Sequence, residues 1–261
     1  MATKTVKRRI FSGAVCEQLV YMVPQYGKRT SSPERQPKAR FPDAESYETF
    51  RTECSRRNHN RRFNYNFRAG DLYCTLTFDN DWEVHRFDDA KRIRRNFVSV
   101  IRRAYPEAVV FLYMGRGKGT DRIHFHMVCH GVPKEFIEKK WKYGSVTRVT
   151  PLREHNYYDS IDYGQDFTGL ANYLFDHWTK EVGGHRWYQT RTAKPPEQED
   201  PTDVRISGGY SENRPPAAPK GYRLVESKAT KYGYLYYKYV LIPPKDNRKS
   251  KKKSLADGQM G

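Results

Sequence analysis

Histidines and apolar residues alternate in one short segment of the chain, Arg122-Ile123-His124-Phe125-His126-Met127-Val128. In a β-strand, residues two apart project from the same face, so His124 and His126 are predicted to lie side by side. Ile123, Phe125 and Met127 would project from the opposite face into a hydrophobic core. Two imidazoles held on a rigid strand can bind a divalent metal ion if a third ligand lies nearby. The alternative is a pair of histidines on a wet strand face, because a His-x-His pair alone is a weak signal.

Two more strands and a helix are predicted upstream of this segment. Residues 71–78 alternate apolar side chains with Tyr and Thr, which is the period of a half-buried strand. Residues 109–114 form a continuous apolar run, and the glycine-rich residues 115–119 form a turn before the histidine strand. Between the two upstream strands, apolar residues recur at helical spacing over residues 88–105.

Downstream of the histidines, the pattern predicts helices over residues 134–141 and 168–181 and strands over 145–149 and 232–242. Strands that follow one another through short turns and alternate with helices are typical of an α+β fold. In such a fold, helices pack on an antiparallel sheet.

The two ends of the chain differ from its middle in composition. Residues 1–66 are basic and irregular, and we predict an arm with one or two short helices. Residues 67–244 form the main domain, and Pro, Glu and Gly over residues 194–220 indicate a loop or flap within it. The Lys/Arg/Ser-rich residues 245–261 are predicted to be a disordered basic tail.

The charge of the chain indicates a polyanionic partner. The formal net charge is +18, and aromatic residues make up 14% of the sequence. Phosphates supply most of the affinity in nucleic-acid binding, and aromatic rings among basic side chains suit unstacked bases. The alternative is a surface charged only for solubility, which needs a net charge of only about 2–8.

The four cysteines show neither metal-site spacing nor the density of a disulfide framework. No apolar run reaches the length of a membrane span. We therefore expect a soluble, cytoplasmic protein that makes no membrane contact.

A second candidate site lies on the predicted helix 168–181, in Ala171-Asn172-Tyr173-Leu174-Phe175-Asp176-His177-Trp178-Thr179-Lys180. Tyr173, His177 and Lys180 would share one stripe of the helix. A tyrosine hydroxyl can act as a covalent nucleophile when it is activated, and a cation such as Lys180 favours the phenolate. The alternative is an amphipathic surface helix with a half-buried tyrosine.

Taken together, these segments resemble the HUH endonucleases, and within them the rolling-circle replication initiators of bacterial phages and plasmids. Cys74-Thr75-Leu76-Thr77-Phe78 resembles their first motif, the His124/His126 pair their second, and Tyr173 with Lys180 their third. Residues 185–191 resemble a stretch that these initiators also carry. The resemblance covers about residues 71–191 and the aromatic strand near the C-terminus.

The resemblance implies a palm-like, ferredoxin/RRM-like antiparallel sheet of about five strands, with the histidine pair on a central strand. It implies that Tyr173 attacks single-stranded origin DNA and forms a 5′-phosphotyrosine link that is later rejoined. The 3′-hydroxyl would start rolling-circle replication by a host polymerase, with a host helicase, in the bacterial cytoplasm. The cofactor would be Mg²⁺ or Mn²⁺ on His124 and His126. The DNA contacts expected around this site are Arg116, Lys118, Arg122, Arg186 and Arg191.

The chain departs from the family pattern at two places. Related initiators carry a glutamate ligand on the strand before the turn, where residues 112–116 contain no carboxylate. The third ligand could instead be supplied by Asp79, Asp121 or His130, and Asp79 is favoured. Some relatives also carry a second tyrosine where this chain has His177, which could shuttle protons or be an ordinary surface histidine.

Other functions fit parts of the same pattern. A non-catalytic nucleic-acid-binding protein with a degenerate histidine site would bind DNA or RNA without a covalent adduct. A transposase or relaxase would share the chemistry but join or transfer different DNA ends. A histidine-triad nucleotide hydrolase is excluded, because Val128 occupies the third in-facing position that such an enzyme needs as histidine.

Overall fold

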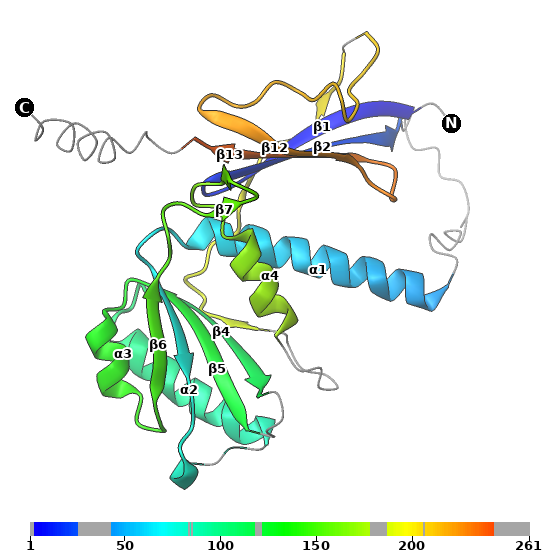
Figure 1. The fold of residues 1–261 in the computed structure, drawn as a ribbon. Coiled ribbons are helices and arrows are strands. Elements are labelled where there is room, and N and C mark those ends of the chain that lie inside the picture. Colours follow the sequence, from blue (N-terminus) through cyan, green and yellow to red (C-terminus); the bar gives the residue numbers. More distant parts are fainter. Residues whose placement is uncertain are drawn as a thin grey trace, which may run out of the picture.

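Two large antiparallel β-sheets with a long helix between them make up the structure (Figure 1). The computed structural model describes residues 3–25, 43–82, 84, 86–117, 122–177, 187–205 and 207–242. The α+β class predicted from the sequence is confirmed. Within the described ranges, no helix combines the length and apolar character needed to cross a lipid bilayer.

The first sheet, which we call the His sheet, carries the histidine pair. Its strands lie in the order β6 (Val146–Pro151), β3 (Leu72–Leu76), β5 (Ile123–His130), β4 (Val109–Arg116) and β9 (Tyr188–Gln189). All neighbours are antiparallel, and the histidine strand β5 is central. The prediction of an antiparallel sheet of about five strands with helices packed on it is therefore confirmed.

One face of the His sheet is covered by α2 (Phe87–Ala104) and α3 (Lys134–Lys140). Ile123, Phe125 and Met127 of β5 are buried there, as their alternation predicts. A short 3₁₀ helix, η1 (Asn80–Trp82), follows β3. This side of the sheet forms the larger hydrophobic core, and it holds the histidine strand in place.

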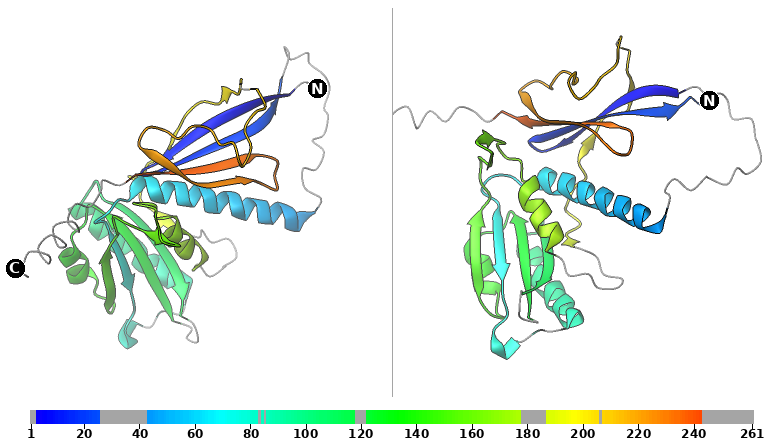
Figure 2. Two further views of the ribbon diagram at one scale, coloured as in Figure 1. Left: turned by 45° about the horizontal axis from the view of Figure 1, so that its top comes forward. Right: turned by 45° about the vertical axis from the view of Figure 1, so that its right-hand side comes forward.

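The opposite face of the His sheet is covered by α1 (Ala44–Asn66) and α4 (Thr168–Asp176). Phe63 of α1 and Leu174 of α4 are buried against Phe111 and Val128 of the sheet. Val128 shares a strand face with His124 and His126, so both helices lie on the histidine side. Both views in Figure 2 show α1 passing between this face and the second sheet.

The second sheet, here called the terminal sheet, joins the two ends of the described chain. Its members are β1 (Thr3–Ser12), β2 (Val15–Pro24), β10 (Glu197–Gln198), β11 (Thr202–Asp203), β12 (Tyr222–Ala229) and β13 (Leu235–Leu241). β2 pairs with β1 on one side and with β13 on the other. The predicted C-terminal strand therefore exists, but it belongs to the terminal sheet and not to the His sheet.

The prediction of a basic arm with short helices over residues 1–66 is wrong. Two strands of ten residues each, paired as a hairpin, and a helix of 23 residues occupy this region. Lys and Arg at the half-exposed positions of β1 hide its apolar alternation, while Val6 and Ile10 are each only 2% exposed. The predicted loop over residues 194–220 contains the two short strands that pair with β1. The predicted tail, residues 245–261, lies outside the described residues.

A small hairpin that the sequence reading did not identify precedes α4. β7 (Tyr157–Tyr158) pairs with β8 (Ile161–Asp162) across a two-residue turn. Asp159 and Ser160 in the turn have φ values of 44° and 64°. Positive φ at both central residues is typical of the hairpin turn whose twist matches the flanking strands. The hairpin lies beside the start of α4 in Figure 1.

Candidate metal centre

Three histidines converge on the side of the His sheet that faces α4. His124 and His126 project from β5, and His177 follows the last residue of α4. The Nε2 atom of His124 lies 3.2 Å from that of His126 and 2.9 Å from that of His177. The ligand atoms of all three lie within 4.8 Å of one another. Nitrogen ligands bound at about 2.1 Å to one metal ion are spaced by about 3 Å, so the three imidazoles fit a shared ion.

Two polar contacts from β3 orient the imidazole of His126. Its Nδ1 atom lies 2.9 Å from the Tyr73 hydroxyl and 3.3 Å from Thr75 Oγ1, both on β3. Thr75 is the direct cross-strand partner of His126, which explains the threonine in this strand. A proton on Nδ1 leaves Nε2 with a free lone pair directed at the other histidines. Contacts of this kind orient metal-binding histidines and set their tautomer.

The imidazoles of His124 and His126 are held in the neutral form that binds metals. The pKa of His126 is lowered to about 3, mainly by burial and in smaller part by the neighbouring His124 and His177. Burial also lowers the pKa of His124, again with a contribution from His177. A metal ion competes with few protons for these nitrogens at neutral pH.

Gly115 on β4 makes the room that His177 occupies. It is the cross-strand partner of His124 and so belongs to the same face of the sheet. A Cβ atom at Gly115 would lie 2.8 Å from His177 Cδ2 and 2.9 Å from the His177 carbonyl oxygen. Any side chain here would displace His177. The strand that lacks the expected carboxylate thus receives a histidine from α4 in its place.

Tyr173 lies beside this cluster. Its ring centroid is 5.9 Å from that of His126 and 5.2 Å from that of His177. Tyr173 is 49% exposed. The peptide N–H of His177 donates to the Tyr173 carbonyl at 3.0 Å, which holds the two residues one turn apart. An accessible phenol therefore stands next to three convergent imidazoles.

An open cavity of about 910 Å³ begins at this point. Tyr73 and Tyr173 both line it, and both contact His126. From there the cavity extends to the β7–β8 hairpin. The cavity is large enough to admit part of a polymeric substrate to Tyr173.

The third ligand predicted from the sequence, Asp79, does not belong to the cluster. Asp79 follows β3, and its Oδ1 accepts a hydrogen bond from the Trp82 peptide N–H at 3.2 Å, so it caps η1. His130 lies at the far end of β5, where its Nδ1 is 2.7 Å from Asp71 Oδ1. Asp121 lies outside the described residues. His177, which the sequence predicted to be a surface histidine or a proton shuttle, lies in the cluster instead of Asp79 and His130.

The cations expected to contact DNA are dispersed. Arg116 lies on the opposite face of the sheet, with its guanidinium 4.8 Å from the Phe87 ring centroid. Arg122 donates to Asn80 Oδ1 at 2.6 Å, and Arg191 is exposed in the turn after β9. Three of the predicted site residues lie outside the described part of the chain: Lys118, Lys180 and Arg186. A role in DNA binding remains a prediction for the five cations, and a catalytic role remains a prediction for Lys180.

The spacing that places His177 on the Tyr173 stripe was also a signal for a ligand role. The separation of four residues puts both on one helix stripe, so a ligand role was open as soon as Tyr173 was assigned to the site. Tyr73 gave no such signal, because alternating tyrosines are ordinary in a half-buried strand. Only the pairing of β3 with β5 brings it to His126.

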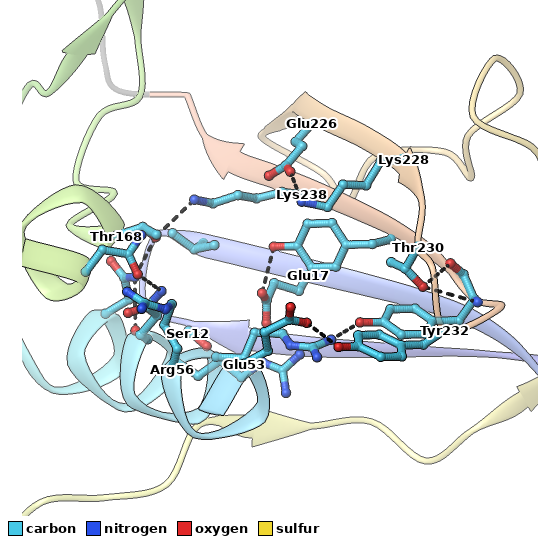
Figure 3. Close-up of a pocket in the computed structure, with 18 of the residues that line it drawn as sticks. Ser12, Glu17, Glu53, Arg56, Thr168, Glu226, Lys228, Thr230, Tyr232 and Lys238 are labelled. Carbon is cyan, nitrogen blue, oxygen red and sulfur yellow. Dashed lines mark hydrogen bonds and ion pairs between the residues drawn. The ribbon is translucent and has the colours of Figure 1, made fainter. Parts of the chain in front are cut away.

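A second cavity, of about 580 Å³, lies between α1 and the terminal sheet (Figure 3). Its charged side chains pair with their neighbours. Lys231 Nζ lies 2.9 Å from Glu53, and Lys228 Nζ lies 2.5 Å from Glu226. We interpret this region as a structural contact between α1 and the sheet.

Neither a protein-family model, nor a curated protein, nor a solved structure matches the chain. The functional proposal therefore rests on the residues of the site.

Proposed function

We propose that this protein is a metal-dependent endonuclease and strand transferase that acts on single-stranded DNA through Tyr173. The observation that carries the proposal is the accessible Tyr173 phenol beside the three imidazoles of His124, His126 and His177. A tyrosine with a purely structural role would not need to lie beside a metal site. Phosphoryl transfer needs this combination of a nucleophile and a centre that stabilises charge.

In the proposed reaction, Tyr173 Oη attacks the phosphorus of a phosphodiester. A bond forms between this oxygen and phosphorus, and the bond from phosphorus to the 3′ oxygen breaks. The phenol loses its proton to solvent, and the leaving 3′ oxygen gains one. The products are a 5′-phosphotyrosine and a 3′-hydroxyl, and attack by that or another 3′-hydroxyl reverses the step. A divalent ion on the histidines would polarise the scissile phosphate.

The ligands bear on the choice of metal ion. The resemblance to the HUH endonucleases implies Mg²⁺ or Mn²⁺. Three imidazoles suit transition metals such as Zn²⁺ better than they suit Mg²⁺, which prefers oxygen ligands. We propose Mn²⁺ or another transition metal as the bound ion, and the assay below compares it with Mg²⁺.

The biological role that we propose is the start of rolling-circle replication in a bacterial cell. The resemblance of the three motifs to replication initiators supports it, and the net charge of +18 supports a DNA partner. In this role the nicked 3′-hydroxyl is extended by a host polymerase while a host helicase opens the duplex.

Among the described residues, no carboxylate joins the three histidines. This observation favours a second candidate function. A protein with a degenerate site would bind single-stranded nucleic acid without cutting it. The two candidates differ in one product, the covalent adduct.

The adduct assay tests the proposal directly. The protein is incubated with a random-sequence pool of labelled single-stranded oligonucleotides, and denaturing electrophoresis detects a covalent product. We expect the adduct with Mn²⁺, its loss in EDTA, and its abolition by Tyr173→Phe, because only the nucleophilic oxygen is removed. Tyr47→Phe is a matched control, since Tyr47 on α1 is also 49% exposed.

An adduct that persists in Tyr173→Phe would assign the nucleophile to another residue. Binding of the pool without any adduct in Mg²⁺, Mn²⁺ or Zn²⁺ would establish the non-catalytic function instead.

A further inference from the structure

Two tyrosines of the β7–β8 hairpin are unusually exposed for aromatic residues. Tyr157 is 64% exposed and Tyr158 is 68% exposed. Both line the cavity of about 910 Å³ that also reaches Tyr173. Adjacent strand residues project to opposite sides, so the two rings present separate surfaces.

Ring contacts and polar contacts hold these rings in place: the Tyr157 ring stacks on His155 at 6.4 Å and the Tyr158 ring meets Tyr163 edge-on at 6.3 Å. His155 Nδ1 lies 2.8 Å from Asp162 Oδ2, and Asn156 Nδ2 donates to the Gly164 carbonyl at 2.7 Å. The Tyr163 peptide N–H donates to the Asn156 carbonyl at 2.7 Å. The polar network closes the hairpin at its base. Each ring keeps most of its surface exposed, so it can still contact a ligand.

Tyr158 lies one helical turn from the proposed nucleophile. A Cβ atom at Gly169 would lie 3.9 Å from Tyr158 Cε2, which places the ring beside the first turn of α4. Gly169 and Tyr173 are four residues apart, on the same stripe of that helix. One turn rises by about 5.4 Å, which is similar to the length of one or two nucleotides of a strand.

The charges around the cavity suit a phosphate backbone. Arg148 and Arg153 are exposed along its wall, and Arg148 lies over the Tyr73 ring at 5.9 Å. The carboxylate of Asp166, which also lines the cavity, is neutralised by Lys238 Nζ at 2.5 Å. The wall therefore has a net positive charge, and its exposed rings are aromatic.

We propose that the β7–β8 hairpin is a stacking platform for bases of single-stranded DNA next to the scissile phosphate. Tyr157 and Tyr158 stack on unpaired bases, while Arg148 and Arg153 contact the backbone that leads to Tyr173. This inference rests on the proposed function, because that function places the scissile phosphate at Tyr173. Stacking on aromatic rings tolerates any base, so the platform holds the strand and leaves recognition of the nick site to other contacts.

The test separates binding from cutting. All proteins carry Tyr173→Phe and are measured in EDTA, so no adduct forms. Fluorescence anisotropy follows binding of a labelled oligo-dT of about 15 nucleotides at one fixed salt concentration. We expect the double variant Tyr157→Ala/Tyr158→Ala to raise Kd by about 10- to 100-fold, the loss typical of stacked bases. The variant Tyr157→Phe/Tyr158→Phe should bind as tightly as the parent, because the ring and not the hydroxyl stacks.

Two controls keep the result interpretable. Tyr47→Ala removes an exposed tyrosine from α1 and should leave Kd unchanged. The thermal unfolding midpoint of the double alanine variant should match the parent, since little buried area is lost. Equal Kd values for the parent and the double alanine variant would overturn the platform. So would a change in oligomeric state with unchanged Kd, because the hairpin would then be a protein contact.

Failure of the proposed function would look different. If the protein binds oligo-dT through the two tyrosines but never forms an adduct, the result supports the platform proposal and contradicts the nuclease proposal. A protein that forms the Tyr173 adduct, but whose binding ignores Tyr157 and Tyr158, would retain the nuclease and lose the platform.

Discussion

At the scale of single residues, the metal centre depends on the close approach of His177 to Gly115. His124 and His126 are two residues apart on one strand, so any strand would place them side by side. His177 comes from a different element and reaches them only because Gly115 has no side chain. The position that completes the metal centre is thus a glycine that contributes no side chain to it.

This leads to a prediction for Gly115→Ala. The new Cβ would overlap His177 Cδ2 and its carbonyl oxygen, so His177 must move away from His124. We expect affinity for Mn²⁺ or Zn²⁺ to fall by about 10- to 100-fold, as when the support of a metal ligand is lost. Isothermal titration calorimetry measures this directly. Gly169→Ala is the control, because its Cβ would meet nothing closer than 3.9 Å. Unchanged affinity in Gly115→Ala would remove His177 from the ligand set.

At the scale of elements, α1 is the long helix that the sequence pattern did not predict. The helix begins at an Asp43 cap, whose Oδ1 accepts from the Ser46 N–H at 2.6 Å. Its buried positions include His59 and Asn64 as well as Phe63. Polar residues on the buried side remove the apolar stripe by which an amphipathic helix is recognised. The helices and strands around the histidines were predicted well because their buried faces are apolar.

The burial of His59 predicts a pH-dependent stability. His59 is fully buried, its Nε2 lies 2.7 Å from the Tyr113 hydroxyl, and burial lowers its pKa from 6.5 to about 4. As the pH falls, His59 therefore binds a proton at a higher pH in the unfolded chain than in the folded chain. Folding should lose stability as pH falls from 6.5 to 4, by about 3 kcal/mol from this residue, and the loss should level off below pH 4.

Urea unfolding in EDTA across this pH range measures the effect. His59→Gln retains a polar contact for Tyr113 but does not titrate, so its stability should fall less steeply with acid than that of the parent. The difference between the two curves isolates His59 from the other histidines. Parallel curves would show that His59 does not titrate differently in the two states.

At the scale of the whole molecule, α1 joins the two sheets. One side of it packs on the His sheet through Phe63, and the other contacts the terminal sheet through Arg61. Glu17 on β2 is the central acceptor, bound by Arg61 and, at 2.7 Å, by the Tyr236 hydroxyl (Figure 3). Glu17 is only 6% exposed. The terminal sheet is therefore attached through a buried ion pair.

We predict that Glu17→Ala destabilises the protein far more than Glu53→Ala. The first leaves Arg61 buried without its partner, which costs about 3–5 kcal/mol. The second breaks an exposed pair with Lys231 on the same helix and sheet, whose side chains are 39% and 62% exposed, and should cost less than about 1 kcal/mol. Chemical denaturation gives both free energies of unfolding. Equal costs would mean that the Glu17 contacts do not hold the sheets together.

The proximity of Tyr173 to His124 and His126 was predicted from the resemblance to the HUH endonucleases. Local sequence was enough to predict the histidine strand and the helices that cover its back face. Each of these follows from a period of two or of about four residues, which neighbouring residues set among themselves. The third histidine, the terminal sheet and the tyrosine hairpin beside the site depended on the tertiary structure. His177 needs the space at Gly115, and β2 needs β13, which lies more than two hundred residues further along the chain. Contacts between residues so far apart are decided by packing, and no local pattern records them.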